Sequence, residues 1–418
     1  MSQELTQSQN WLSKKYLAYQ FLTNLFFVGA VWLYFFRLFI TDQQVGILDG
    51  FAFAIGLIAE VPSGVLADRF GRDKMVKLGQ FLVGSGFLIQ AFGSSYAPFF
   101  LGQAIMMVGV SFVSGADEAL FFSKLNFDRN SVNWRKLLTR GSQAALFGLL
   151  VSTILGGWLH LIHPRIPWVL TGLSFIGSVL LIWSIKDTRP EKGKQKFYNE
   201  LRGHLTSIKS GFLQFRTPKL WLYVPIILTV QGLFYTVGWG LLRLVLLDRF
   251  HFDPFWGSVV VVTSNLITVG ILALMNKYAE NLSERRVLLL ISLSAAASML
   301  LSLADIGMWG YFVIFALYAG EHILYPFMSE VLNNRAEENQ RATVLSVASF
   351  LRTLPYVFLA PTIGYLNTRN NLEYFLAGWA LLIVAAILFY IFLNKKDDFV
   401  SLVKTSIKKE SRVPEIST

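Results

Sequence analysis

Ionisable side chains stand inside long apolar stretches of this sequence, where they could bind a proton or an ion. Glu60 lies in an apolar run at 47–67, Glu321 and His322 lie in a run at 308–332, and Arg352 lies in a run at 342–366. A charge in such a run is expensive, so it usually faces a polar cavity or a partner. The acid groups and the imidazole are therefore candidates for proton binding.

Each of these residues also has a structural interpretation. Glu60 lies eight residues before Asp68, or about 12 Å along a helix, and Pro62 weakens the helix beside it. Glu60 could titrate or could pair with an arginine or a helix end. Arg352 needs a carboxylate, which we expect Glu321 to supply, although an anionic substrate would also serve.

Two arginines occupy matched positions in the two halves of the chain. Arg37 precedes Asp42 by five residues, and Arg243 precedes Asp248 by the same interval. Both lie near the ends of apolar runs. The simple interpretation is that they extend to the interface, and the alternative is a paired extracellular gate or an anion contact.

A dense charged turn, residues 64–74, separates the run at 47–67 from the next run at 75–93. Gly64 could admit a neighbouring helix, and the arginines of the turn could bind carboxylates or helix-end carbonyls. Asp117 and Glu118 are the expected acceptors. A plain positive anchor would not need this spacing, so we expect a conformational latch formed by Gly64, Asp68, Arg69, Gly71, Arg72, Asp117 and Glu118.

The pattern Gly-x-x-x-Asp-Arg-x-Gly-Arg-x-Lys at 64–74 resembles the loop between helices 2 and 3 of the major facilitator superfamily. The resemblance implies an alternating-access carrier with two six-helix bundles around a central site. It covers the whole chain at the level of its spans. Two departures put a drug-antiporter assignment in doubt: Gln103 stands where many proton-coupled members have arginine, and the run ending Gly156-Gly157 lacks the usual proline.

Composition and charge agree with a polytopic membrane protein. The 418 residues are 54% hydrophobic and only 15% charged, with a net charge of +11. The basic residues gather in loops on one face, which favours cytoplasmic termini over nucleic-acid binding. The five histidines are scattered and there is no cysteine, so we expect no metal, no cofactor and no enzyme.

Twelve apolar runs predict an all-α membrane protein with twelve transmembrane helices in two pseudo-symmetric six-helix bundles. The expected units are a bundle at 1–185, a cytoplasmic linker with an amphipathic helix at 186–219, a bundle at 220–393 and a basic cytoplasmic tail at 394–418. Among the runs, those at 16–39 and 220–247 are expected to be single spans. We expect a monomer in the bilayer of a bacterial inner membrane.

Aromatic residues are dense in the first span of each half, including Trp32, Tyr235 and Trp239. Facing a cavity, they would suit amphiphilic or aromatic compounds, although they could equally face lipid. The sequence thus predicts a proton-coupled carrier that exports such a small molecule. Alternatives are a carrier of an anionic metabolite or a uniporter, and more remotely a membrane sensor or membrane enzyme.

Overall fold

The chain folds into helices throughout its described part. The computed structural model describes residues 7–125, 132–187, 202–203, 206, 209–278 and 283–410, except for the side chains of 7–8, 61, 65, 68, 132–133, 275–278, 339 and 394–410. Eight helices in this part are long and apolar enough to cross a membrane. The expected linker helix and the end of the basic tail fall largely outside the described residues.

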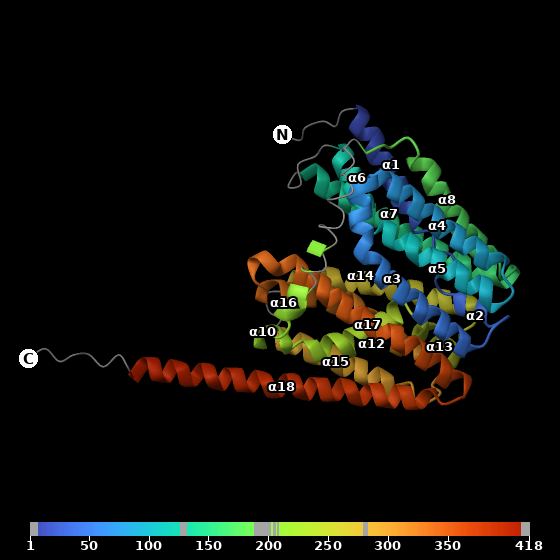
Figure 1. The fold of residues 1–418 in the computed structure, drawn as a ribbon. Coiled ribbons are helices and arrows are strands. Elements are labelled where there is room, and N and C mark those ends of the chain that lie inside the picture. Colours follow the sequence, from blue (N-terminus) through green and yellow to red (C-terminus); the bar gives the residue numbers. More distant parts are fainter. Residues whose placement is uncertain are drawn as a thin grey trace, which may run out of the picture.

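The first half, residues 7–187, packs around α4 and α5. Figure 1 shows its helices together, coloured from blue to green. Helix α4 packs against α5 and α8, and α1 packs against α7 and α8. The helices are α1 (Gln7–Thr23), α2 (Trp32–Phe36), α3 (Asp42–Phe70), α4 (Arg72–Phe92), α5 (Tyr96–Val113), α6 (Ala116–Leu125), α7 (Val132–Ile162) and α8 (Ile166–Ile182).

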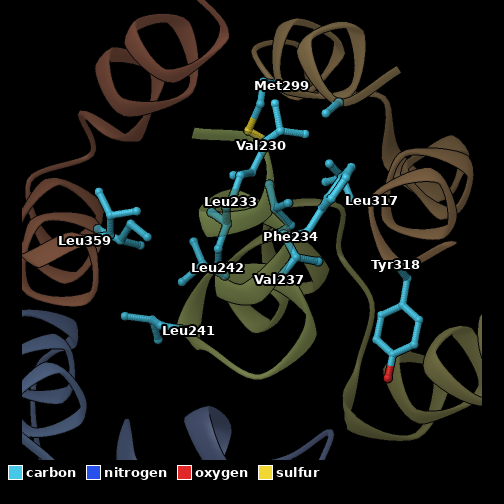
Figure 2. Packing of buried hydrophobic residues seen from close by; sticks show 14 of the residues in the cluster. Val230, Leu233, Phe234, Val237, Leu241, Leu242, Met299, Leu317, Tyr318 and Leu359 are labelled. Carbon is cyan, nitrogen blue, oxygen red and sulfur yellow. The ribbon is translucent and has the colours of Figure 1, made fainter. Parts of the chain in front are cut away.

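The second half, residues 209–410, surrounds α12 and α13, whose side chains are almost fully buried. Figure 2 shows Phe234 and Val237 of this core among side chains from neighbouring helices. Helix α18 extends beyond the other helices as one long rod (Figure 1). The helices are α10 (Pro218–Trp221), α11 (Val224–Ile226), the π-helix η1 (Ile227–Gln231), α12 (Gly232–Gly238), α13 (Leu241–Arg249), α14 (Pro254–Tyr278), α15 (Glu284–Leu301), η3 (Gly307–Trp309), α16 (Gly310–Arg335), η4 (Glu338–Gln340), α17 (Arg341–Thr368) and α18 (Leu372–Glu410).

The first span of each half is broken, which corrects the expectation of single helices at 16–39 and 220–247. Residues 24–31 form turns between α1 and α2, and Trp239 and Gly240 separate α12 from α13. Backbone groups freed by a break must find other partners in an apolar setting. In the first break, Ser152 accepts from the N–H of Phe26 at 2.9 Å, and Ser174 donates to the carbonyl of Leu25 at 3.3 Å.

The apolar run at 98–122, which the sequence predicts to be the fourth span, is also divided, into α5 and α6. The division falls at Ser114 and Gly115, and Gly115 has a positive φ of 69°. Glycine adopts this conformation without the steric penalty that other residues meet. The remaining expected spans coincide with single helices whose ends differ by a few residues, apart from α7, which begins eight residues earlier, and α18, which continues to Glu410. These spans were expected at 47–67, 75–93, 140–162, 167–185, 255–276, 287–303, 308–332, 342–366 and 372–393.

Candidate functional site

One face of α3 meets α17 of the other half. Residues 42, 46, 49, 53 and 60 fall within about 60° of one another around a helix. A Cβ atom on Gly46 would lie 2.3 Å from the carbonyl oxygen of Ala360, and one on Gly364 would lie 2.2 Å from that of Asp42. The two helices therefore touch backbone to backbone near the start of α3, which we call the Asp42 end of the molecule.

Arg37 joins the two halves at the Asp42 end. Its Nε lies 2.7 Å from Oδ1 of Asp42, and its Nη1 lies 2.7 Å from Oδ2 of Asp248 in the second half. Asn367 of α17 also donates to Asp42, and the N–H of Gln43 donates to Thr368 at 2.9 Å. These polar contacts add to the helix packing there.

Arg243 crosses the same interface in the opposite direction. Its Nη2 donates to the carbonyl of Gly29 in the first break at 2.7 Å, and its Nη1 donates to the carbonyl of Gly238, the last residue before the second break, at 2.9 Å. Only 6% of the residue is exposed. The interpretation that Arg243 extends to the interface is therefore wrong, because its guanidinium binds backbone oxygens inside the protein.

Arg352 and Glu321 form a buried ion pair in the second half. Nη1 of Arg352 lies 2.8 Å from Oε1 of Glu321, and their side chains are 11% and 7% exposed. The guanidinium carbon lies 4.0 Å from the ring centre of Tyr325 and 5.1 Å from that of Tyr235. His322 points elsewhere, because its Nδ1 lies 3.0 Å from the carbonyl oxygen of Tyr318 on its own helix.

Asp49 is a buried acid that the sequence analysis did not single out. It lies on the α17-facing side of α3, with 4% of its surface exposed. The hydroxyl group of Tyr356 donates to Oδ2, and Nε2 of Gln103 donates to Oδ1 at 3.2 Å. Asp49 stands two residues into the apolar run at 47–67, so it resembled an interfacial residue. A lone acid on the same helix face as Glu60 was the available signal.

The opposite end of α3, which we call the Gly71 end, carries the charged turn. Gly71 has φ of 94°, so the turn from α3 to α4 requires glycine there. Nη1 of Arg72 donates to the carbonyl of Ala119 on α6 at 3.3 Å, and its N–H donates to Asp187 at 3.2 Å.

One described contact of this turn differs from those expected. In the described contact the acceptor on α6 is a backbone carbonyl, whereas carboxylates of Asp117 and Glu118 were expected. Asp117 instead accepts from the hydroxyl of Tyr19 at 3.4 Å, and Glu118 is exposed. Lys77, one turn further along α4, pairs with Asp73 of the charged turn at 3.1 Å. It also donates to the carbonyl of Ile185, after α8, at 2.6 Å. Arg69 lies with its guanidinium carbon 5.0 Å from the ring centre of Phe70, and the side chain of Asp68 is outside the described residues.

Glu60 and Gly64 continue the α17-facing side of α3 toward the Gly71 end. Glu60 is exposed, and a Cβ atom on Gly64 would meet nothing within 4 Å. The close helix approach expected at Gly64 is therefore absent from this conformation in the described residues. The described hydrogen bonds and ion pairs between the halves involve residues 29–49 of the first half, all near the Asp42 end.

The three aromatic candidates occupy different settings. Tyr235 packs edge-on against Phe53 of the other half, with ring centres 5.8 Å apart, and lies beside Tyr356 at 6.0 Å. Trp32 packs against Phe36 within the first half. Trp239, in the second break, is 66% exposed. Of the three, only Tyr235 lies beside both Tyr356, the partner of Asp49, and Arg352, the partner of Glu321.

The sequence and the fold have clear relatives. The family model described as Major Facilitator Superfamily matches residues 16–360. "Multidrug resistance protein 2" of Bacillus subtilis (strain 168) is 23% identical over 365 residues, which cover 84% of this chain and 87% of that protein. "Uncharacterized MFS-type transporter YxaM" of the same organism is 20% identical over 396 residues, covering 88% of this chain and 92% of that one.

Solved structures give the same fold. A single-residue variant of the nucleoside transporter NupG superimposes with a TM-score of 0.75 at 11% identity, covering 91% of this chain and 99% of that one. A POT family transporter in complex with 5-aminolevulinic acid gives a TM-score of 0.71 at 14% identity, covering 93% and 96%. At these identities the likeness concerns the fold alone.

Proposed function

The chain belongs to the Major Facilitator Superfamily, and we propose that it is a proton-coupled transporter that exports a small amphiphilic or aromatic compound. The observation that supports this most is the Glu321–Arg352 pair between two tyrosines. It offers a titratable acid, a cation and aromatic faces in one place. Tyr325, at the edge of this group, is 43% exposed. The relative named for multidrug resistance agrees with this substrate class.

We propose that the two halves are the two moving units and that the Gly71 end and both termini face the cytoplasm. The excess of Lys and Arg in the corresponding loops supports this orientation in a bacterial inner membrane. The conformation described above is then closed outward and open inward. Glu60, exposed on the α17-facing side of α3, becomes accessible to cytoplasmic protons.

In the opposite conformation, the Gly71 end closes. Gly64 then admits α17, and the turn at 64–74 with Asp117 and Glu118 acts as the latch. The open space beside Gly64 in the present state supports this assignment. A monomer is sufficient for the mechanism.

The test offers purified protein in weakly buffered detergent a panel of organic cations, neutral aromatics and organic anions while pH is recorded. A pH change with one class identifies the substrate class and its proton linkage, and Glu60→Gln and Glu321→Gln variants identify the acid. Vesicles with an imposed pH gradient then measure transport. Transport that ignores the gradient would contradict proton coupling and favour a uniporter.

A carrier of an anionic metabolite is the second candidate. The Nε of Arg352 is buried without a hydrogen-bond partner in the described structure, so the guanidinium has a spare donor. An anion could bind there beside, or in place of, Glu321. An Arg352→Gln protein should then lose anion affinity, whereas unchanged affinity would eliminate this candidate.

A further inference from the structure

Asp49 lies where three helices from both halves meet. Its carboxyl group accepts from Gln103 of α5 within the first half and from Tyr356 of α17 in the second. The hydroxyl oxygen of Tyr356 also accepts from the N–H of Leu241, the first residue after the second break, at 2.7 Å. A Cβ atom on Gly240 would lie 2.3 Å from the Tyr356 ring, so the break is fitted closely to this ring.

The groups that face Asp49 provide no positive charge. In the described part of the chain, no Lys, Arg or His forms an ion pair with it. Its direct partners, Gln103 and Tyr356, are neutral. The charged groups on the surrounding helices are occupied elsewhere or are acids: Arg352 on Glu321, Arg37 on Asp42 and Asp248, Arg243 on two carbonyls, and Glu60 exposed on α3 itself. Tyr235, the neighbouring phenol on α12, is neutral as well.

A buried carboxylate without a cation is expensive, and such a group commonly takes up a proton instead. Asp49 is buried only while α3 and α17 are together at the Asp42 end. Parting of the helices there would remove Tyr356 and admit water. Burial of this carboxyl group and closure of that end are therefore one event.

We propose that Asp49 is a proton-binding site and that closure of the Asp42 end takes up one proton there. A hydronium ion in the water on that side supplies the proton: one of its O–H bonds breaks, an O–H bond forms on the carboxylate, and a water molecule is left. This inference rests on the proposed alternating access, and it identifies a second acid about 16 Å along α3 from Glu60. The two acids are exposed in opposite conformations.

The test measures the separation of two spin labels across the Asp42 end. The chain contains no cysteine, so Leu38→Cys and Met308→Cys place labels without background. Both positions are exposed, at 58% and 74%, and lie in the first and second halves. Distances are recorded in detergent between pH 5 and pH 9, with melting temperatures to verify folding.

In the labelled parent, the short-distance fraction should fall as pH rises. Asp49→Asn, which mimics the protonated group in size and hydrogen bonding, should stay short throughout. Gln103→Leu removes a donor that favours the ionised form, so it should raise the midpoint by about one pH unit. Glu337→Gln removes an exposed acid that is not proposed to bind a proton, so this control should titrate like the parent.

A parent without pH dependence would overturn the proposal, and so would an Asp49→Asn protein that titrates like the parent or a Glu337→Gln protein that does not titrate. The proposed function fails differently. If the labels titrate through Asp49 while vesicle transport ignores a pH gradient, the proton site stands and the coupling does not. If transport follows the gradient while Asp49→Asn still titrates, the coupling stands and Asp49 is not the site.

Discussion

Replacing Gly364 by alanine should open the Asp42 end. The added Cβ would lie 2.2 Å from the carbonyl oxygen of Asp42 and 3.1 Å from the Cα of Gly46. Both neighbours are backbone atoms, so no flexible side chain can move aside. Helices α3 and α17 would have to separate by about 1 Å, since a carbon and an oxygen in contact stay roughly 3.2 Å apart.

Overpacking of this kind typically costs about 2 kcal/mol, within a range of ~1–3. The cost falls on the closed state alone, because separated helices do not make this contact. The ratio of closed to open molecules at the Asp42 end should therefore fall about 30-fold, taking ~1.4 kcal/mol for each tenfold change.

The assay is the distance distribution between labels at positions 38 and 308. Gly378→Ala is the matched control, because a Cβ atom there meets nothing within 4 Å and the residue lies on α18. Gly364→Ala should shift the distribution to longer distances, whereas Gly378→Ala should leave it unchanged. Equal distributions for the two variants, both folded, would refute the idea that this backbone contact holds the end closed.

Three further substitutions have clear expected outcomes. Arg352→Gln leaves Glu321 buried without its cation and should lower the free energy of unfolding by about 3 kcal/mol, and adding Glu321→Gln should restore most of this loss. Thermal unfolding in detergent measures both variants. A double variant no more stable than the single one would contradict a paired charge. Arg37→Gln removes the ion pairs to Asp42 and Asp248. After allowance for the partial exposure of these groups, the ratio of closed to open molecules, measured with the labels at 38 and 308, should fall by about tenfold. An unchanged ratio would show that helix packing alone holds the Asp42 end closed. Gly71→Ala places a side chain on a residue with φ of 94° and should lower the free energy of unfolding by ~1–2 kcal/mol. Gly177→Ala, in a helix with open space around it, should be neutral or stabilising. Equal melting temperatures for the two variants would argue against a strained turn.

The sequence predicts the fold well because apolar runs of about 20 residues have few other uses. The Glu321–Arg352 pair was also foreseeable, since an arginine near the middle of a span needs a carboxylate and one stood on the preceding helix. The breaks at 24–31 and 239–240 were not foreseeable in the same way. Their residues are as apolar as the helices around them, and the freed backbone groups are satisfied by Ser152, Ser174 and Arg243 from distant positions.

Burial was predicted less well than position. Glu60 lies in the expected helix, yet it is exposed, and a Cβ atom on Gly64 one turn further along would meet nothing within 4 Å. Asp49 lies eleven residues earlier on the same face and is buried because the halves touch there. Burial of both acids therefore depends on a rigid-body arrangement that a single sequence does not encode in any local pattern.

The two breaks divide the first span of each half into separate helices. Helix α2 has five residues and α13 has nine, and irregular backbone separates each of them from the helix before it. Arg243 links the two breaks, because its guanidinium binds the carbonyl of Gly29 in the first break and that of Gly238 directly before the second. Loss of these two Arg243 contacts would allow α2 and α13 to tilt while α1 and α12 keep their packing. The Asp42 end would then open by tilting of these two short helices, without rotation of either half as a whole.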